Sequence, residues 1–215
     1  AYTLYVTTLL ATIRRIIEFA EQFQRGMTGI ERFMELMDAS IDIFDEEGAV
    51  PLENVMGEIT FRHVSFAYPD DPAPVLSHID LTIRPGEKVA LVGPSGGGKT
   101  TLCSLIPRFY DPTEGEILLD GTDIRHVTLK SLRDNIGVDQ QDVYLFSGSV
   151  YENIAYGRPG ATREEVTEAA KRARAHEFIL GLKDGYDTFV GERGVKLSGG
   201  QKQRISIARV FLKAP

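Results

Sequence analysis

The 215 residues predict an α/β fold: a mixed or parallel sheet with an antiparallel β subdomain and a helical subdomain, preceded by a long amphipathic helix. Three observations predict it. Apolar residues recur at helical spacing over residues 9–44, alternating strand patterns begin at Gly57, and helical patterns dominate the C-terminal part. We therefore expect residues 1–50 to be helix and linker, and residues 51–215 to be one domain.

The composition is that of an ordinary soluble protein, with 42% apolar residues and a net charge of −7. Acidic and basic residues are interspersed, which argues against a nucleic-acid-binding function because such proteins carry a basic patch. Cys103 is the single cysteine and is expected to be a small buried apolar residue. The uncharged residues 1–13 are fewer than the roughly 20 of a membrane span, and are compatible with the end of one.

The N-terminal region predicts a long amphipathic helix, because its apolar residues are separated by gaps of three and four. Gly26 and Gly29 predict a break in this helix. Residues 45–55, which include Gly48 and Pro51, predict a linker.

The first strands are predicted by alternating apolar residues at 59–68 and 79–83. A change of phase near Arg62 and His63 indicates a β-bulge, and residues 69–72 predict the turn between the strands. The short apolar run 88–92 predicts a buried strand that leads into a glycine-rich loop, and residues 100–108 predict the helix after it.

Further strands are predicted at residues 117–119 and 136–138, and the remainder of the chain is predicted to be helical. Thr162 and Glu165 form the pattern of a capping box, in which a hydroxyl and a carboxylate satisfy two free backbone amides. Ser198 predicts the start of another helix.

The glycine-rich loop matches the pattern G-x-x-x-x-G-K-T at residues 93–100, which predicts a phosphate-loop NTPase-type sheet that binds ATP with Mg²⁺. Glycines allow backbone amides to approach phosphates, the Lys99 ammonium attracts them, and the Thr100 hydroxyl ligates the metal. Kinases, GTPases, motors and transporters share this loop. The expected nucleotide-binding residues are Gly93, Ser95, Gly96, Gly97, Gly98, Lys99, Thr100 and Thr101.

A second glycine motif, Leu197-Ser198-Gly199-Gly200-Gln201, follows about a hundred residues later. With this pair of motifs the chain resembles the nucleotide-binding domain of ATP-binding-cassette (ABC) transporters, over residues 57–215 and more loosely over 1–54. The resemblance implies that Ser198, Gly199, Gly200 and Gln201 bind the nucleotide held by a facing domain.

The resemblance also implies roles for single residues. Tyr68 would stack on adenine, and Gln141, with Gln140 as its rival, would contact Mg²⁺ and the attacking water, acting in catalysis with Lys99. Residues 190–194 and 146–154 resemble exporter-type domains. Asp139 departs from the family pattern, which usually has an apolar residue there.

The function that the resemblance implies is that of an exporter ATPase, an ATP hydrolase at the cytoplasmic face of the cell membrane. Its partners would be transmembrane domains and a second nucleotide-binding domain, identical or related. The family's apolar strand ending in Asp-Glu is missing after Pro215, so we expect the chain to be a segment that is inactive alone. The alternatives are a soluble ABC ATPase and a regulatory module with a degenerate site.

Overall fold

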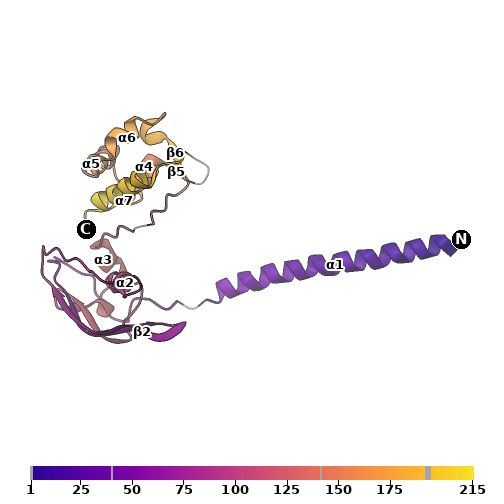
Figure 1. Ribbon diagram of the computed structural model, residues 1–215, viewed down its shortest axis with the longest axis horizontal. Helices are drawn as coiled ribbons and strands as arrows, with labels where there is room; N and C mark the ends of the chain where they lie inside the picture. The colour runs from indigo at the N-terminus through magenta and orange to yellow at the C-terminus, as the bar shows by residue number, and fades with distance from the viewer. Residues whose placement is uncertain (1, 40, 141, 192–194) are drawn as a thin grey trace. The chain divides into compact units, whose positions relative to one another are not determined.

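The computed structural model describes residues 2–39, 41–140, 142–191 and 195–215 (Figure 1). Contacts within the chain divide it into two compact units, residues 1–42 and residues 43–215. Its elements are α1 (Tyr2–Met37), β1 (Ile59–Tyr68), β2 (Asp71–Ile83), α2 (Lys99–Leu105), β3 (Glu114–Leu119), β4 (Thr122–Asp123), η1 (Ile124–His126), α3 (Leu129–Asp134), β5 (Gly148–Ser149), α4 (Val150–Ala155), α5 (Arg163–Arg172), α6 (His176–Leu180), η2 (Gly185–Asp187), β6 (Phe189–Val190) and α7 (Gly199–Lys213).

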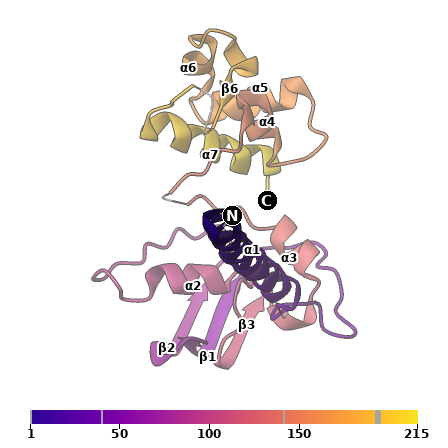
Figure 2. The ribbon, with the colours of Figure 1, turned by 90° about the vertical axis from the view of Figure 1, so that its right-hand side faces the viewer.

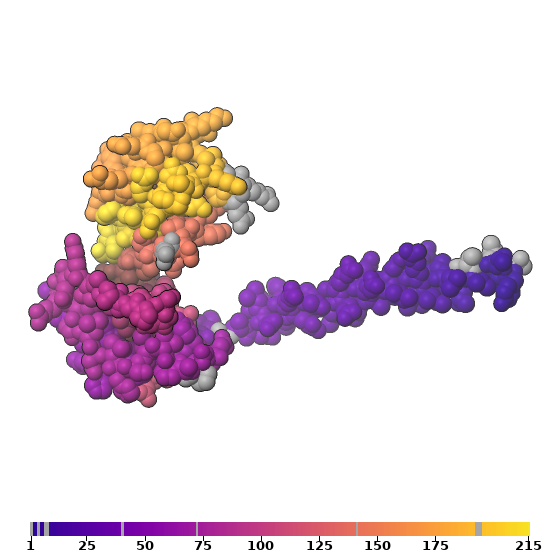
Figure 3. Space-filling model, viewed as in Figure 1, coloured from indigo at the N-terminus to yellow at the C-terminus, as the bar shows by residue number. Residues whose placement is uncertain are grey.

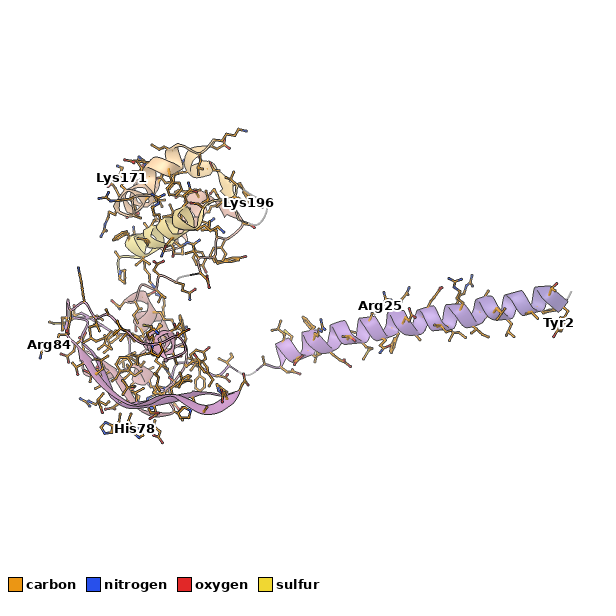
Figure 4. All side chains as sticks on the ribbon, in the orientation of Figure 1. Tyr2, Arg25, His78, Arg84, Lys171 and Lys196 are labelled. Carbon is orange, nitrogen blue, oxygen red and sulfur yellow. The ribbon has the colours of Figure 1, made fainter. Side chains whose placement is uncertain are left out.

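The N-terminal unit contains the single helix α1, which continues through Gly26 and Gly29 without the predicted break. In the space-filling view it is the long extended part at the indigo end of the colour scale (Figure 3). Each glycine costs a helix only about 1 kcal/mol relative to alanine, and the surrounding helix-forming residues outweigh it. Figure 4 shows side chains, among them that of Arg25, projecting along the whole helix. Its apolar stripe, including Phe23 and Ile30, is exposed. Among the described residues, no helix is both long and apolar enough for a membrane span.

The first half of the larger unit is a four-stranded antiparallel sheet in the order β2-β1-β3-β4, and Figure 2 shows its three longer strands side by side. The predicted bulge is confirmed: the pairing of β1 shifts between Phe61 and Val64, and His63 has φ +49°. Helices α2 and α3 pack against this sheet. We call their shared interior the sheet core, which contains Phe61, Val64, Phe66, Leu76, Leu102, Leu105, Ile117, Leu119, Ile124, Val127 and Leu132.

The parallel part of the predicted sheet is not formed among the described residues. Residues 88–92 and 136–138 have no strand pairing, and Val92 is 89% exposed. A parallel strand inside a sheet needs neighbours on both edges. Here the segment 136–138 contacts α7 instead: the Ile136 carbonyl accepts a hydrogen bond from Lys213 Nζ at 2.9 Å, and Gly137 lies close to Val210. The α/β class and the antiparallel subdomain are confirmed, whereas these two strands were predicted wrongly.

The segment before β1 is attached to the sheet half, in contrast to the linker predicted at residues 45–55. The Leu129 amide donates to Asp45 Oδ1 at 2.7 Å, and Val50 pairs with Val127. Further along, the Asp120 carboxylate accepts hydrogen bonds from three consecutive backbone amides, at residues 56–58. These contacts hold the chain in place as it enters β1.

The second half of the larger unit is mainly helical and confirms the predicted helical subdomain. Helices α4 and α5 pack against α7, and β5 pairs antiparallel with β6. Both predicted helix starts are confirmed, since Thr162 with Glu165 and Ser198 with Gln201 form complete capping boxes. We call this interior the helical core, which contains Val150, Ile154, Val166, Ala169, Ala170, Ile179, Val190, Leu197, Ile205, Ala208 and Leu212.

Candidate functional site

The glycine-rich loop curls around the ammonium group of Lys99. Lys99 Nζ donates to the carbonyl oxygens of Gly93 at 3.0 Å and of Pro94 at 2.7 Å. The Gly97 amide donates to the same Pro94 carbonyl at 3.2 Å. An ammonium has three donors, so the two loop contacts leave it capacity for a further acceptor.

Glycine is required at the base of this loop. Gly98 has φ +77°, and a Cβ atom there would lie 2.7 Å from Leu76 Cδ2, a member of the sheet core. Gly96 also has a positive φ, +79°, but a Cβ atom there would meet nothing within 4 Å. The loop is therefore packed against the sheet half behind Gly98 and open at Gly96.

The groups around this opening suit a phosphate ligand. α2 begins at Lys99, has no acidic residue in its first turn, and leaves its first backbone amides without helical acceptors. Thr100 is exposed in that turn. An ammonium, a hydroxyl and a row of amides match the oxygens of a triphosphate, and the hydroxyl suits Mg²⁺.

Tyr68 lies beside the same helix. Its hydroxyl is 3.0 Å from Thr101 Oγ1, so the structure brings these two predicted site residues together. The Tyr68 ring packs at right angles against Phe66 and Tyr110, with centroid distances of 4.9 and 5.3 Å. This cluster fixes the ring at the end of β1, and its stacking on adenine stays a prediction.

Cys103 is exposed on α2, so the expectation that it is buried was wrong. Thr101, Leu102 and Leu105 occupy the buried side of this short helix. Cys103 therefore faces away from the sheet core, on the opposite side of the helix.

The second glycine motif lies at the start of α7. Ser198 is the N-cap: its hydroxyl accepts from the Gln201 amide at 3.3 Å, and its own amide donates to Gln201 Oε1 at 2.9 Å. Leu197 is anchored in the helical core. Gly199 and Gly200 are exposed, and a Cβ atom on either would meet nothing within 4 Å. The motif is thus the open end of a firmly held helix.

Gln141 and residues 192–194, which were assigned roles, lie outside the described residues. The residues after Gln141 are held by a cluster that the sequence analysis did not assign. Arg209 on α7 donates to the Tyr144 carbonyl at 2.9 Å, and to the backbone and side-chain oxygens of Asn153 at 2.6 and 2.7 Å. Asn153 is buried, and burial lowers the pKa of Arg209. Asn153 falls within the exporter-like stretch, but nothing in the sequence pattern pointed to Arg209.

Taken together, a glycine loop that encloses a lysine at the start of a helix defines a nucleotide-binding domain of the phosphate-loop type. The family model for the ABC transporter matches residues 76–215, and the chain therefore belongs to the ABC transporter family.

Curated relatives agree with this assignment. The uncharacterized ABC transporter ATP-binding protein YwjA of Bacillus subtilis is 52% identical over 215 residues, which are 100% of this chain and 37% of that protein. A putative multidrug export ATP-binding/permease protein of Staphylococcus aureus is 60% identical over 181 residues, 84% of this chain and 31% of the relative. The chain thus spans about a third of the length of these relatives.

A solved structure shows the same fold. It is that of a bacterial Atm1-family ABC exporter with ATP bound, with a TM-score of 0.80 and 47% sequence identity. The likeness covers 89% of this chain and 33% of that one.

Proposed function

We propose that this chain supplies the ATP-binding domain of an exporter that couples ATP binding and hydrolysis to transport of a substrate across the membrane. Four observations support the proposal. The chain belongs to the ABC transporter family, relatives carry names of multidrug exporters, and the similar structure is an exporter with ATP bound. The donors around Gly96 suit a triphosphate.

In this function Lys99 and the loop amides would bind the phosphates, and Thr100 and Gln141 would hold a Mg²⁺ ion that neutralises phosphate charge. Tyr68 would stack on the adenine, and the hydrogen bond between its hydroxyl and Thr101 would fix the orientation of its ring. Bound ATP supplies the phosphoryl group whose transfer to water releases the free energy used in transport. The loop's part is to bind and orient the phosphates, since positioning and electrostatics dominate phosphoryl transfer.

The single observation that carries the proposal is the open space at Gly199 and Gly200. A glycine in a helix is roughly 1 kcal/mol less favourable than alanine. Neither position has a positive φ, and no atom of the described structure is close enough to exclude a Cβ. The fold of this chain therefore gives no reason for glycine. We infer that the reason is the close approach of a nucleotide held by a second, identical or related, nucleotide-binding domain.

The other partners are transmembrane domains, with α1 as the cytoplasmic end of a membrane helix and the ATP-binding domain at the cytoplasmic face. The chain's one Asp-Glu pair, Asp45-Glu46, lies in the segment before β1, where Asp45 binds the Leu129 amide. Both carboxylates have contacts outside the phosphate loop, since Asp45 accepts from the Leu129 amide and Glu46 pairs with His126. The pair also lies about 50 residues before the phosphate loop in the sequence. We therefore propose that these 215 residues alone bind nucleotide without efficient hydrolysis.

The test is ATP binding and turnover by the assembled transporter carrying Lys99→Ala. We expect turnover to fall by roughly 100-fold or more, the effect of removing one preorganised charged donor from a transition state. The control is Lys171→Ala on α5: this lysine, labelled in Figure 4, forms an exposed ion pair with Glu168. Unchanged affinity and turnover in the Lys99→Ala variant would refute the assigned role.

A further inference from the structure

One face of α7 carries a row of hydrogen-bond donors. Ser206, Arg209 and Lys213 follow one another at spacings of three and four, so their side chains emerge on the same side of the helix. All three donate to the stretch that contains Gln141 in the sequence. Their acceptors are Asp139 Oδ1 at 2.5 Å, the Tyr144 carbonyl at 2.9 Å and the Ile136 carbonyl at 2.9 Å.

The backbone of this stretch also approaches α7 closely. A Cβ atom on Gly137 would lie 2.6 Å from Val210 Cγ1, so a larger residue could not fit without displacement. A Cβ atom on Gly157 would collide with the Arg209 carbonyl. Gly137 and Gly157 therefore each allow their own segment of the chain to approach the helix turn that contains Arg209 and Val210.

Among the described residues of this stretch, Asp139 is the one whose side chain accepts a hydrogen bond from this row. Ser206 is 8% exposed in the middle of α7, and a buried hydroxyl needs a partner. A carboxylate acceptor makes this hydrogen bond stronger than a neutral one. The acidic residue that departs from the family pattern thus has a specific contact.

We propose that Asp139 is a positioning residue that fixes the stretch carrying Gln141 to the helix that begins at Ser198. The inference rests on the proposed function. Gln141 is two residues beyond Asp139 in the sequence, and the glycines of the second motif begin the helix whose middle Asp139 contacts. Through the hydrogen bond from Ser206, helix α7 would fix the position of the stretch that carries Gln141 relative to the glycines of the second motif.

The two outer contacts explain why this role can be separated from folding. Lys213 and Arg209 donate to backbone carbonyls on either side of Asp139, and these bonds are independent of the residue type at position 139. Replacement of Asp139 leaves both in place. The contact that is lost is the hydrogen bond from Ser206 to Asp139, two residues before Gln141 in the sequence.

The experiment measures ATP turnover by the assembled transporter with Asp139→Ala, Ser206→Ala and the double variant. We expect each single variant to lower kcat roughly tenfold, the size of a lost hydrogen bond to a charged group. The apparent KM for ATP should change by less than about twofold, because the phosphate loop is untouched. The double variant should be no worse than the singles, since both remove one contact.

Two conservative variants complete the test. Asp139→Asn keeps an acceptor oxygen and Ser206→Thr keeps the hydroxyl, so both should retain kcat within about twofold. Wild-type kcat in the alanine variants, additive losses in the double variant, or failure of the conservative variants to retain kcat would each overturn the inference. Lys99→Ala separates the two claims: if it abolishes turnover while Asp139→Ala does not change kcat, the proposed function stands and the positioning role falls.

Discussion

The two glycine motifs are held in different ways. The phosphate loop is held mostly by contacts within itself, chiefly those of Lys99 with the Gly93 and Pro94 carbonyls, and it packs against the sheet core at Gly98. The residues leading into it are exposed. The second motif begins a 15-residue helix with a complete capping box, and the opposite face of that helix is buried in the helical core. One motif is a loop held mainly by its own lysine, and the other is the capped start of a helix that is packed in a core.

The same residue type therefore serves two purposes. In the loop, glycine is demanded by the chain itself, because Gly98 has a left-handed backbone and is packed against Leu76. At the start of α7, glycine leaves a space that the chain does not fill. This difference fits the proposed function, in which the loop would bind the chain's own nucleotide and the start of α7 would meet a nucleotide held by a second domain.

The largest loss of stability is expected where α7, the helix that begins with the second glycine motif, packs in the helical core. Ile205 is fully buried on α7, so Ile205→Ala should destabilise the protein by about 2–5 kcal/mol through lost burial and a cavity. Denaturant unfolding measures the change. The control is Gln203→Ala on the exposed side of the same helix, expected within about 0.5 kcal/mol. Equal effects would mean that α7 is not anchored as described.

The next effect separates the two uses of glycine. Gly98→Ala should destabilise by about 1–3 kcal/mol, because alanine is strained at φ +77° and its Cβ would collide with Leu76. Gly199→Ala should be neutral or stabilising by up to about 1 kcal/mol, yet lower ATP turnover. Thermal unfolding and turnover of the two variants check this. A loss of stability in Gly199→Ala would show that the glycine has a structural purpose after all.

Local features of this fold were predictable from sequence, and those that depend on distant partners were not. The capping box at Thr162, the helix start at Ser198 and the bulge at His63 are set by neighbouring residues, and all three were predicted correctly. The strand expected at residues 88–92 needed partners from elsewhere in the chain. An apolar run predicts that a segment is buried, but it does not predict which other strand the segment pairs with.

The same limit applied to the site. The phosphate loop and the second motif were identified because their function depends on residue type at fixed spacing. Arg209 and Asn153 lie 56 residues apart, and their contact follows from the packing of α4 against α7. No local pattern encodes such a pair. The contact between Asp139 and Ser206 was missed for the same reason, although Asp139 was noticed as unusual.

A smaller effect tests whether the cap of the second motif is structural or functional. Ser198→Ala and Thr162→Ala each remove the hydroxyl of a capping box, and each should cost about 1 kcal/mol. Only Ser198→Ala should also impair ATP turnover, because Thr162 caps α5. Denaturant unfolding and turnover are measured on both variants. If both impair turnover equally, the loss reflects stability, and Ser198 has no special relation to the nucleotide.

The smallest effect concerns acid sensitivity of the sheet half. Burial alone raises the pKa of Asp120, but the backbone amides of residues 56–58 outweigh it, so the folded pKa lies below the usual value. The stability from this carboxylate is present above its unfolded pKa of about 3.9 and is lost as pH falls through the folded pKa. Asp120→Ala should therefore unfold more easily at pH 7, and its stability should decline less than that of the wild type on acidification. Unfolding curves between about pH 7 and pH 2 measure this, with Gln203→Ala expected to run parallel to the wild type. An equally steep decline in Asp120→Ala would mean that the segment before β1 does not depend on this carboxylate, and that other contacts, such as those of Asp45, Val50 and Leu52, hold it.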